Sequence, residues 1–327
     1  MRNKVGGALW LLAAIAIGGP ADAAETHVVV YTAHEASIVD QIVPRFEKET
    51  GITVDVVKAG SGDILNRVKA ESGVPRADVI WSVGGDLLAA NPTLLQAYKP
   101  ANFDATLDPK FATAGNWLPY SGVVMVMMVN TQQLKPADYP KSWMDLTDPK
   151  WKGKISSARA DGSASAFIQY VTILTAFGDK GPDVYSRIFA NFALSDSSGA
   201  VPRFVSDGEA SVGLTLEDNA LQYVQGGGKV AILYPSEGTS LTADGVALVK
   251  GGPDANAGKK FIDYVLSQPI QQLLVQKIGR RSIRTDVASS SVLPPLSQIK
   301  VVPYDLDTIA RDRGKLLAAW KKIVASQ

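Results

Sequence analysis

The sequence places two adjacent carboxylates, Glu217 and Asp218, directly after a short apolar run. A third carboxylate, Glu237, follows in a polar loop between two strand-like segments. Carboxylates accept hydrogen bonds from neighbouring hydroxyl or ammonium groups, and they also bind hard cations. We therefore predict that Asp218 and Glu237 face a ligand-binding cleft, with Glu217 beside them. The alternative for Glu217 is an exposed surface position, which is usual for glutamate.

Two serines, Ser163 and Ser165, stand at the start of residues 161–177, a long apolar segment that predicts a helix. The first turn of a helix has backbone N–H groups without partners, and the helix dipole favours negative charge there. These serines therefore predict an anion-binding site. Plain capping of the helix is the alternative, because serine is a preferred N-cap.

Small residues also follow two predicted strands in the first part of the chain: Ser61 and Gly62, and then Ser82 and Gly84. Strands alternate here with helix-like segments, which predicts a mostly parallel α/β sheet. In such sheets, ligands bind beyond the carboxyl ends of the strands. We therefore predict that these four residues hydrogen-bond the ligand from the wall opposite Ser163. A purely structural role in turns is the alternative.

Two strongly apolar strand-like segments, 121–130 and 244–249, predict that the chain crosses between two α/β lobes. We expect a first lobe from residues 24–121 and 243–286, and a second lobe from residues 122–242. Residues 287–327 are expected to form a C-terminal helical segment that packs across the lobes. Helices are also expected at 86–98 and 255–277.

The first residues carry Arg2 and Lys4, then an apolar run, and then Ala21-Asp22-Ala23. A basic start, an apolar centre and small residues before a cleavage point are typical of a secretory signal peptide. The run is shorter than the roughly 20 residues that a membrane span needs. We therefore expect residues 1–23 to be removed and the mature chain to be exported.

The sequence has 33 basic and 32 acidic residues and no cysteine. This charge balance argues against nucleic acid or an anionic membrane as a partner. Without cysteine, neither a disulfide nor a thiolate metal site can form. The sequence also lacks the G-x-S-x-G and H-E-x-x-H motifs of common hydrolases. We expect a monomeric binding protein without a cofactor or a resident metal, and not an enzyme.

Several stretches together point to one family: VVVYTAHEASIVDQIVPRFEKETGITV, RADVIWSVG, DPKWKGKI, YPSEGTSLTADGVALVKGG, NAGKKFIDYVLS and RRSIRTDV. Over almost the whole mature chain the sequence resembles the periplasmic solute-binding proteins of bacterial ABC importers. The resemblance is to the type II branch that contains ferric-ion, hexose-phosphate and aminophosphonate binders. It implies two α/β lobes, each a mixed sheet flanked by helices, joined by a two-crossing hinge that closes on a solute. It also implies a periplasmic location and an inner-membrane ABC permease as partner.

The resemblance assigns roles to further residues. Ser163 and Ser165 match the helix start at which ferric-type relatives hold a synergistic anion, and Ser198 matches a neighbouring polar contact. His34 lies one position from the iron-binding histidine of those relatives, so it is either a ligand contact or an exposed bystander. Glu237 is similar to an acidic residue that hexose-phosphate binders use in the same loop.

At Glu217 and Asp218, the ferric-type relatives have two consecutive tyrosines whose phenolates bind iron. Their acidic ligand from the first lobe is also missing, because Val83 stands at its place. These departures favour a small phosphorylated solute, with a hexose phosphate preferred and an aminophosphonate possible. Serines and helix ends would hold the phosphate, and carboxylates the hydroxyl or ammonium groups. The alternative is ferric ion, bound by carboxylates, His34 and a captured anion.

A basic run, Arg280, Arg281 and Arg284, follows a predicted helix. Contact with a phosphate is one interpretation. A solvated charge cluster or a contact with the other lobe is the interpretation that we favour, because arginine is mostly exposed or paired.

Overall fold

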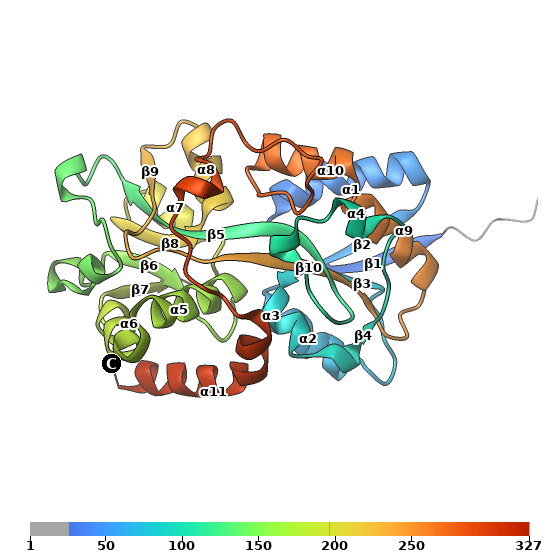
Figure 1. The fold of residues 1–327 in the computed structure, drawn as a ribbon, viewed down its shortest axis with the longest axis horizontal. Helices are drawn as coiled ribbons and strands as arrows, with labels where there is room; N and C mark the ends of the chain where they lie inside the picture. Colours follow the sequence, from blue (N-terminus) through green and yellow to red (C-terminus); the bar gives the residue numbers. More distant parts are fainter. Residues whose placement is uncertain (1–25, 196, 327) are drawn as a thin grey trace, which may run out of the picture.

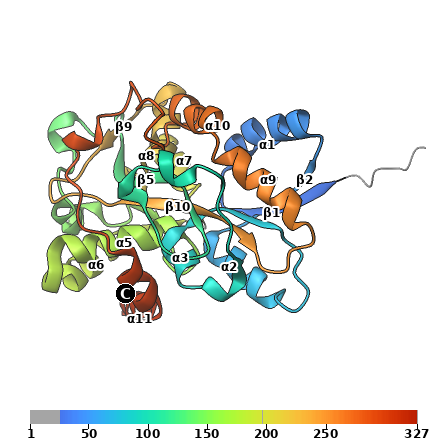
Figure 2. The same ribbon diagram turned by 45° about the vertical axis from the view of Figure 1, so that its right-hand side comes forward.

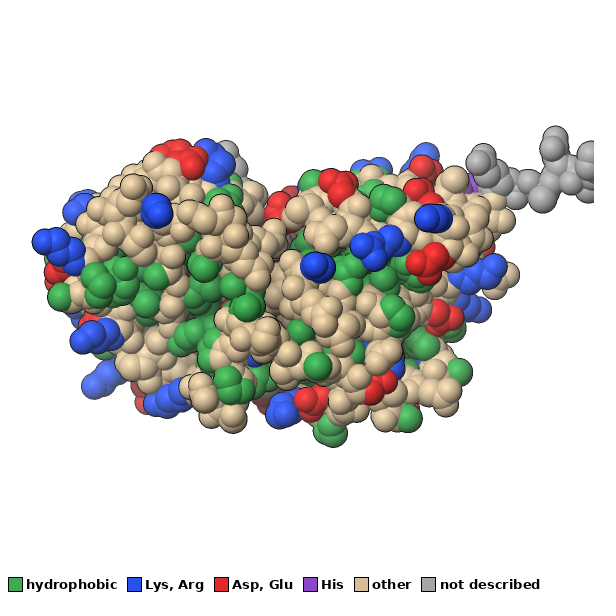
Figure 3. Space-filling model, turned by 90° about the horizontal axis from the view of Figure 1, so that it is seen from above, with side chains coloured by type: hydrophobic (Ala, Val, Ile, Leu, Met, Phe, Trp, Pro, Cys, Tyr) green, Lys and Arg blue, Asp and Glu red, His purple; other side chains and the backbone are tan. Residues whose placement is uncertain are grey.

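The computed structural model describes residues 26–195 and 197–326, so the expected signal peptide lies outside the described residues. The molecule has two halves, each a β-sheet with helices on both faces (Figure 1). A space-filling view shows two rounded masses with a constriction between them (Figure 3). Basic and acidic side chains are interspersed on that face, which agrees with the balanced composition.

The first half is built on parallel strands with an antiparallel neighbour. β1 pairs in parallel with β2 on one side and β3 on the other, and β10 pairs antiparallel with β3. Valine and isoleucine are frequent in these strands because β-branched side chains fit a buried, pleated surface. The strands are β1 (His27–Thr32), β2 (Thr53–Lys58), β3 (Val79–Gly84), β4 (Leu95–Gln96) and β10 (Leu241–Val249).

Helices cover both faces of this sheet. α1 buries Ile38, Ile42 and Phe46, which are spaced at the helical period, in a core that it shares with α9. The two helices lie side by side (Figure 2). α2 and α3 cover the opposite face, where Ile64 and Leu88 are buried. The helices are α1 (Ala36–Thr50), α2 (Ser61–Ala70), α3 (Gly85–Ala89), α4 (Phe103–Thr106), α9 (Ala255–Val265) and α10 (Gln268–Leu273).

The second half contains a mixed sheet. β8 pairs antiparallel with β5 and in parallel with β6, and β7 continues in parallel beyond β6. Its strands are β5 (Leu118–Asn130), β6 (Ile155–Ala158), β7 (Phe192–Ser195), β8 (Val212–Leu216) and β9 (Val230–Leu233). Its helices are α5 (Ala164–Phe177), α6 (Gly181–Phe189), α7 (Val201–Ser206) and α8 (Glu217–Gln225).

β5 and β10 belong to both halves. They pair antiparallel with each other from Leu241 opposite Val124 to Val246 opposite Leu118. β10 continues into the first sheet beside β3, and β5 continues into the second beside β8. The pairing register shifts between Asp244 and Gly245, and such a bulge bends a strand locally. Hydrogen-bonded strands therefore run continuously from the first half into the second, in the order β2-β1-β3-β10-β5-β8-β6-β7.

The C-terminal helix α11 (Leu306–Ala325) contacts both halves. Arg313 forms a buried ion pair with Asp86 of α3, and its guanidinium lies 3.8 Å from the ring centre of Phe167 in α5. Further along, the indole N–H of Trp320 donates to Tyr185 of α6 at 3.1 Å.

Two of the expected helices are interrupted by proline. The segment 86–98 is helical only in α3, because Pro92 starts a short 3₁₀ turn that leads into β4. The segment 255–277 divides into α9 and α10, since Pro269 cannot continue the first helix. Among the described residues, no helix is long and apolar enough to cross a membrane.

Candidate ligand-binding site

A cavity of about 190 Å³ lies between the two halves, which both contribute to its walls. Its lining is rich in serine hydroxyls: Ser61, Ser82, Ser163, Ser165, Ser197 and Ser198. Its charged lining residues are Glu35, Asp63, Arg159, Asp244 and Arg280. Small or apolar residues and one amide complete the wall, namely Ala33, Gly60, Ala158, Gly162, Ala164, Ile168, Leu216 and Asn219.

Helices from both halves begin at this cavity. α2 of the first half begins at Ser61, and α5 of the second half follows its N-cap Ser163. Asn219 lies in the first turn of α8, and Glu35 is the N-cap of α1. The first-turn N–H groups of these helices lack intrahelical partners, and their dipoles favour negative charge. The cavity therefore suits an anion that is approached from two sides.

Ser163 has two roles that the sequence left as alternatives. Its Oγ accepts a hydrogen bond from the backbone N–H of Ala166 at 3.2 Å, so it caps α5. The same oxygen lies 3.0 Å from Oγ of Ser165, and both side chains line the cavity. Ser163 therefore caps α5 and also lines the cavity.

Ser82 is held in an unusual backbone conformation at the cavity wall. Its φ angle is 57°, in the left-handed region that non-glycine residues rarely adopt. Its hydroxyl donates to Oδ2 of Asp244 at 2.8 Å. Such a conformation costs on the order of 1 kcal/mol and persists only where surrounding contacts hold it. Residues of this kind are common at binding sites.

Arg280 is the buried cation of the cavity. Its Nε donates to Asp218 at 2.7 Å, and its Nη1 donates to Asp244 at 2.6 Å and to Ser121 at 2.9 Å. Burial disfavours its charge, but the carboxylates of Asp218 and Asp244 outweigh that effect and raise the pKa of Arg280. The side chain therefore stays cationic beside the cavity.

Gly62 and Gly84 lie against the opposite half and not on the cavity wall. A Cβ atom at Gly62 would lie 2.9 Å from the carbonyl oxygen of Asp161, and one at Gly84 would lie 2.9 Å from Cβ of Ala164. The expectation that these glycines donate to the ligand is therefore replaced by a contact between the halves.

The described residues contain no group of three or more histidine, aspartate or glutamate side chains placed to hold a metal ion. No tyrosine or histidine is among the described residues that line the cavity. The lining is thus made of hydroxyls, helix N-termini and paired charges.

Residues 28–279 match the family of bacterial extracellular solute-binding proteins. The chain belongs to this family. It is a substrate-binding protein of an ABC importer, a periplasmic class, which implies a permease partner and a small solute. Proteins of this family bind solutes and are not enzymes.

Similar proteins cover nearly the whole chain. The structure of AfuA from Actinobacillus pleuropneumoniae with bound fructose-6-phosphate superposes with a TM-score of 0.86 and 26% identity, over 92% of this chain and 99% of that one. A putative 2-aminoethylphosphonate-binding periplasmic protein of Salmonella typhimurium is 27% identical over 86% of each chain. Iron-bound HitA from Pseudomonas aeruginosa shares the fold, with a TM-score of 0.78 and 20% identity over 91% of this chain and 99% of that one. The expected α/β type II fold is thereby confirmed.

In this solute-binding protein, the predicted acidic pair lies behind the cavity. Glu217 receives two hydrogen bonds from Arg281, at 2.8 and 2.7 Å, and one from Tyr234. Asp218 is occupied by Arg280. Neither carboxylate is part of the lining, so their expected contact with a ligand stays a prediction that this cavity does not support. A buried carboxylate requires a partner, and the two arginines supply one for each.

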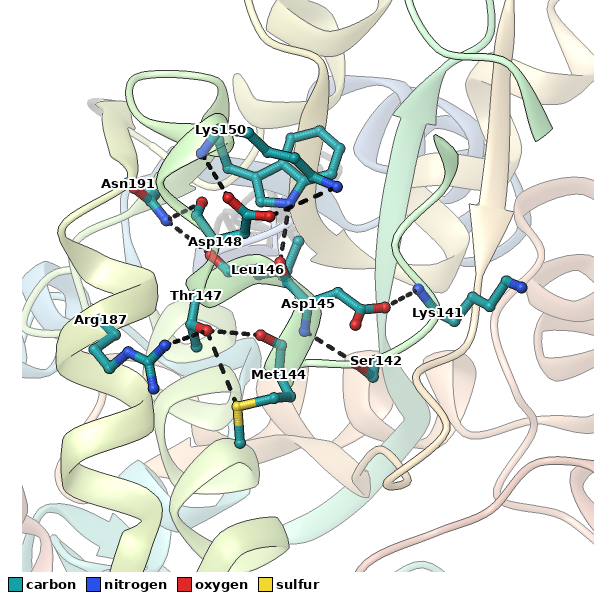
Figure 4. A network of polar contacts seen from close by, with 11 residues as sticks. Lys141, Ser142, Met144, Asp145, Leu146, Thr147, Asp148, Lys150, Arg187 and Asn191 are labelled. Atoms are coloured by element: carbon teal, nitrogen blue, oxygen red, sulfur yellow. Dashed lines mark hydrogen bonds and ion pairs between the residues drawn. The ribbon is translucent and has the colours of Figure 1, made fainter. Parts of the chain in front are cut away.

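Glu237 also lies away from the cavity. Its carboxylate accepts from the backbone N–H groups of Trp143 and Met144, at 3.0 and 3.1 Å, and so caps the 3₁₀ turn Met144–Thr147. Figure 4 shows how this turn is held: Arg187 donates to Thr147 at 3.0 Å, and Asn191 donates to two backbone carbonyls. Glu237 therefore holds this turn, and its expected contact with a ligand stays a prediction that the cavity lining does not support.

His34 is neither exposed nor part of the cavity wall; its neighbour Ala33 lines the cavity instead. The ring packs edge-on against Trp81 and Tyr120, with centroids 4.5 and 5.4 Å away. Its nitrogens have no hydrogen-bond partner among the described residues. Burial, and then the charge of Arg280, hold the pKa of His34 well below its ordinary value. A neutral, enclosed ring fits neither of the roles expected from the sequence.

Sequence reasoning missed several lining residues. Asn219 directly follows the predicted acidic pair, in a segment for which no helix was predicted and which forms the first turn of α8. Ser197 adjoins the predicted Ser198, and Asp63 stands at the start of α2 beside the predicted Ser61. Arg159, which pairs with Asp161 at 2.8 Å and thereby lowers the pKa of that carboxyl, had no recognisable sequence signal.

Proposed function

We propose that this protein captures a small phosphorylated solute in the cavity between its halves, by hinge closure, and delivers it to its ABC permease. A hexose phosphate is the preferred solute, and an aminophosphonate is the second choice. One observation carries the proposal: serine hydroxyls and helix N-termini from both halves converge on a single cavity. Phosphate oxygens are acceptors only, so a wall of hydroxyl and N–H donors complements them.

The phosphate end of the solute is assigned to Ser61, Ser163, Ser165 and Ser198, with Ser197 added from the structure. Arg280 lines the same cavity and is paired with two carboxylates, so it contributes N–H donors and no net positive charge. A paired cation avoids the cost of an unpaired buried charge.

The organic end of the solute is assigned to Glu35 and Asp63, which line the same cavity. Carboxylates accept hydrogen bonds from sugar hydroxyls and pair with an ammonium group. The names of two similar proteins support these two choices of solute: one was solved with fructose-6-phosphate bound, and the other is a putative 2-aminoethylphosphonate-binding protein. Iron-binding relatives exist as well, but the cavity lining offers no phenolate or imidazole among the described residues.

Calorimetry tests the proposal on protein that has been unfolded and refolded to remove any copurified ligand. The titrants are fructose 6-phosphate, 2-aminoethylphosphonate, inorganic phosphate, fructose and ferric citrate. We expect binding of a phosphorylated organic compound and none of fructose. Tight binding of iron with no binding of any phosphorylated compound would overturn the proposal.

A further inference from the structure

At Gly60 and Gly62, beside the cavity, the backbone of the first half lies directly against the backbone of the second half. A Cβ atom at Gly60 would lie 2.7 Å from the carbonyl oxygen of Gly162. One at Gly62 would lie 2.9 Å from the carbonyl oxygen of Asp161. Contacts this short do not occur for real Cβ atoms, so either side chain would force the two backbones apart. No change of rotamer can relieve the clash, because the obstacle is a main-chain oxygen.

The obstruction at these two positions comes from the opposite half. Among the three atoms nearest to a Cβ at Gly60, the one from its own half is Oδ2 of Asp63, at an ordinary 3.4 Å. The three atoms nearest to a Cβ at Gly62 belong to Asp161 and Gly162. Neither glycine has a positive φ angle, so alanine fits both backbones. At Gly62, inside α2, alanine would also favour the helix.

Other glycines between the halves lack this property. A Cβ at Gly84 would also approach Asp86 of its own half, at 3.0 Å. A Cβ at Gly199 would meet the carboxylate of Glu35, which is the flexible end of a side chain and can move. At Gly60 and Gly62, an added methyl group therefore opposes the approach of the halves and disturbs the packing within the first half little.

We infer that Gly60 and Gly62 determine closure: their missing side chains let the start of α2 reach the backbone at residues 161–162 and shut the cavity around the solute. The inference rests on the proposed hinge closure. Donors on both walls must reach one anion at the same time, so a separation of a few tenths of an ångström lengthens hydrogen bonds across the whole site. These glycines thereby set the affinity through the approach of the halves, and Gly62, which is not part of the cavity lining, isolates this effect from direct contact with the solute.

The first experiment compares Gly60→Ala and Gly62→Ala with Gly73→Ala, a control in the same half where a Cβ meets nothing within 4 Å. By calorimetry with fructose 6-phosphate and 2-aminoethylphosphonate, we expect about ten-fold weaker binding for the first two variants and wild-type affinity for the control. The thermal midpoint without ligand should stay the same in all three, which separates blocked closure from misfolding.

A second experiment needs no ligand. Oγ of Ser37 in α1 and Oε1 of Gln222 in α8 lie 3.4 Å apart across the two halves. Because the chain has no cysteine, Ser37→Cys with Gln222→Cys creates a single pair of thiols that a short bifunctional thiol reagent joins only when the halves approach. Adding Gly62→Ala should slow this cross-linking about ten-fold, whereas adding Gly73→Ala should not change it.

The outcomes distinguish the two proposals. Wild-type affinity together with an unchanged cross-linking rate in Gly62→Ala would overturn the closure role and leave the proposed function intact. If the wild-type protein binds no phosphorylated compound, the proposed function fails. The ligand-free cross-linking rate then still decides whether these glycines govern closure.

Discussion

Arg280 and Asp218 form a buried ion pair between the two halves, with Nε of the arginine 2.7 Å from Oδ2 of the aspartate. The arginine follows α10 in the first half, and the aspartate lies in the first turn of α8 in the second. Asp244, on the strand shared by both halves, binds the same guanidinium. The pair fixes the position of Arg280 at the edge of the cavity.

Asp218→Asn should destabilise the fold by about 1.5 kcal/mol, because it weakens a buried charge-assisted hydrogen bond while Asp244 still pairs with Arg280. Urea unfolding followed by circular dichroism measures the change. Asp207→Asn is the control, since that carboxylate is half-exposed and its ion-pair partner among the described residues is the exposed Arg203. We expect its effect to stay under about 0.5 kcal/mol. Equal effects of the two substitutions would contradict the assigned role of Asp218.

Ser165→Ala and Ser163→Ala should differ in their effect on stability. Ser163 caps α5, so its loss should cost about 1 kcal/mol of unfolding free energy as well as affinity. Ser165 has no capping bond among the described residues, so its loss should weaken ligand binding about five-fold and change stability little. Calorimetry and thermal unfolding of both variants decide this. Full affinity in both would remove these serines from the proposed site.

Glu237→Gln should leave ligand affinity unchanged and lower stability by about 1 kcal/mol. Its two carboxylate oxygens each accept one backbone hydrogen bond in the second half, whereas glutamine keeps a single acceptor oxygen, so one backbone N–H loses its partner. Parallel titrations of ligand and of urea measure the two quantities. A loss of affinity at constant stability would return this residue to the binding site.

His34 should make the fold sensitive to acid. Burial, and then Arg280, hold its pKa in the folded protein well below the ordinary 6.5. The unfolded chain therefore binds a proton below about pH 6.5 that the folded chain does not bind. Stability should fall by up to about 1.4 kcal/mol per pH unit as the pH drops through that range.

The variant His34→Phe isolates this contribution, because phenylalanine retains the contacts with Trp81 and Tyr120 but cannot be protonated. The difference in unfolding free energy between wild type and variant should be constant above pH 7 and should shift in favour of the variant below it. A difference independent of pH would mean that the ring is protonated equally in both states.

From the sequence, the segments that form the cavity wall could be predicted, but the direction of individual side chains could not. Ser61, Ser82, Ser163, Ser165 and Ser198 were all expected in the wall and all line the cavity. That success has a physical reason: strand ends and helix starts are marked locally by small and hydroxyl-bearing residues. Whether these serines contact a solute remains a prediction.

The carboxylates could not be placed in the same way. Glu217 and Asp218 are directed by Arg281 and Arg280, which lie 64 and 62 positions further along the chain. No local pattern reveals such a partner. An acidic pair after a short apolar run therefore suggested a binding site, whereas in the fold both carboxylates pair with buried arginines. The interruptions at Pro92 and Pro269, by contrast, follow from rules that apply to the local sequence.

The sharing of β5 and β10 between the sheets has a consequence for unfolding. Each sheet contains a strand that continues into the other half. In β10, residues Leu241–Val246 pair with β5 at the junction, and the same strand pairs with β3 in the first sheet. If one half unfolded, β5 or β10 would lose backbone hydrogen bonds that also hold the other half. The molecule should therefore lose its structure in one cooperative transition, and a single calorimetric peak is expected where two independent domains would give two.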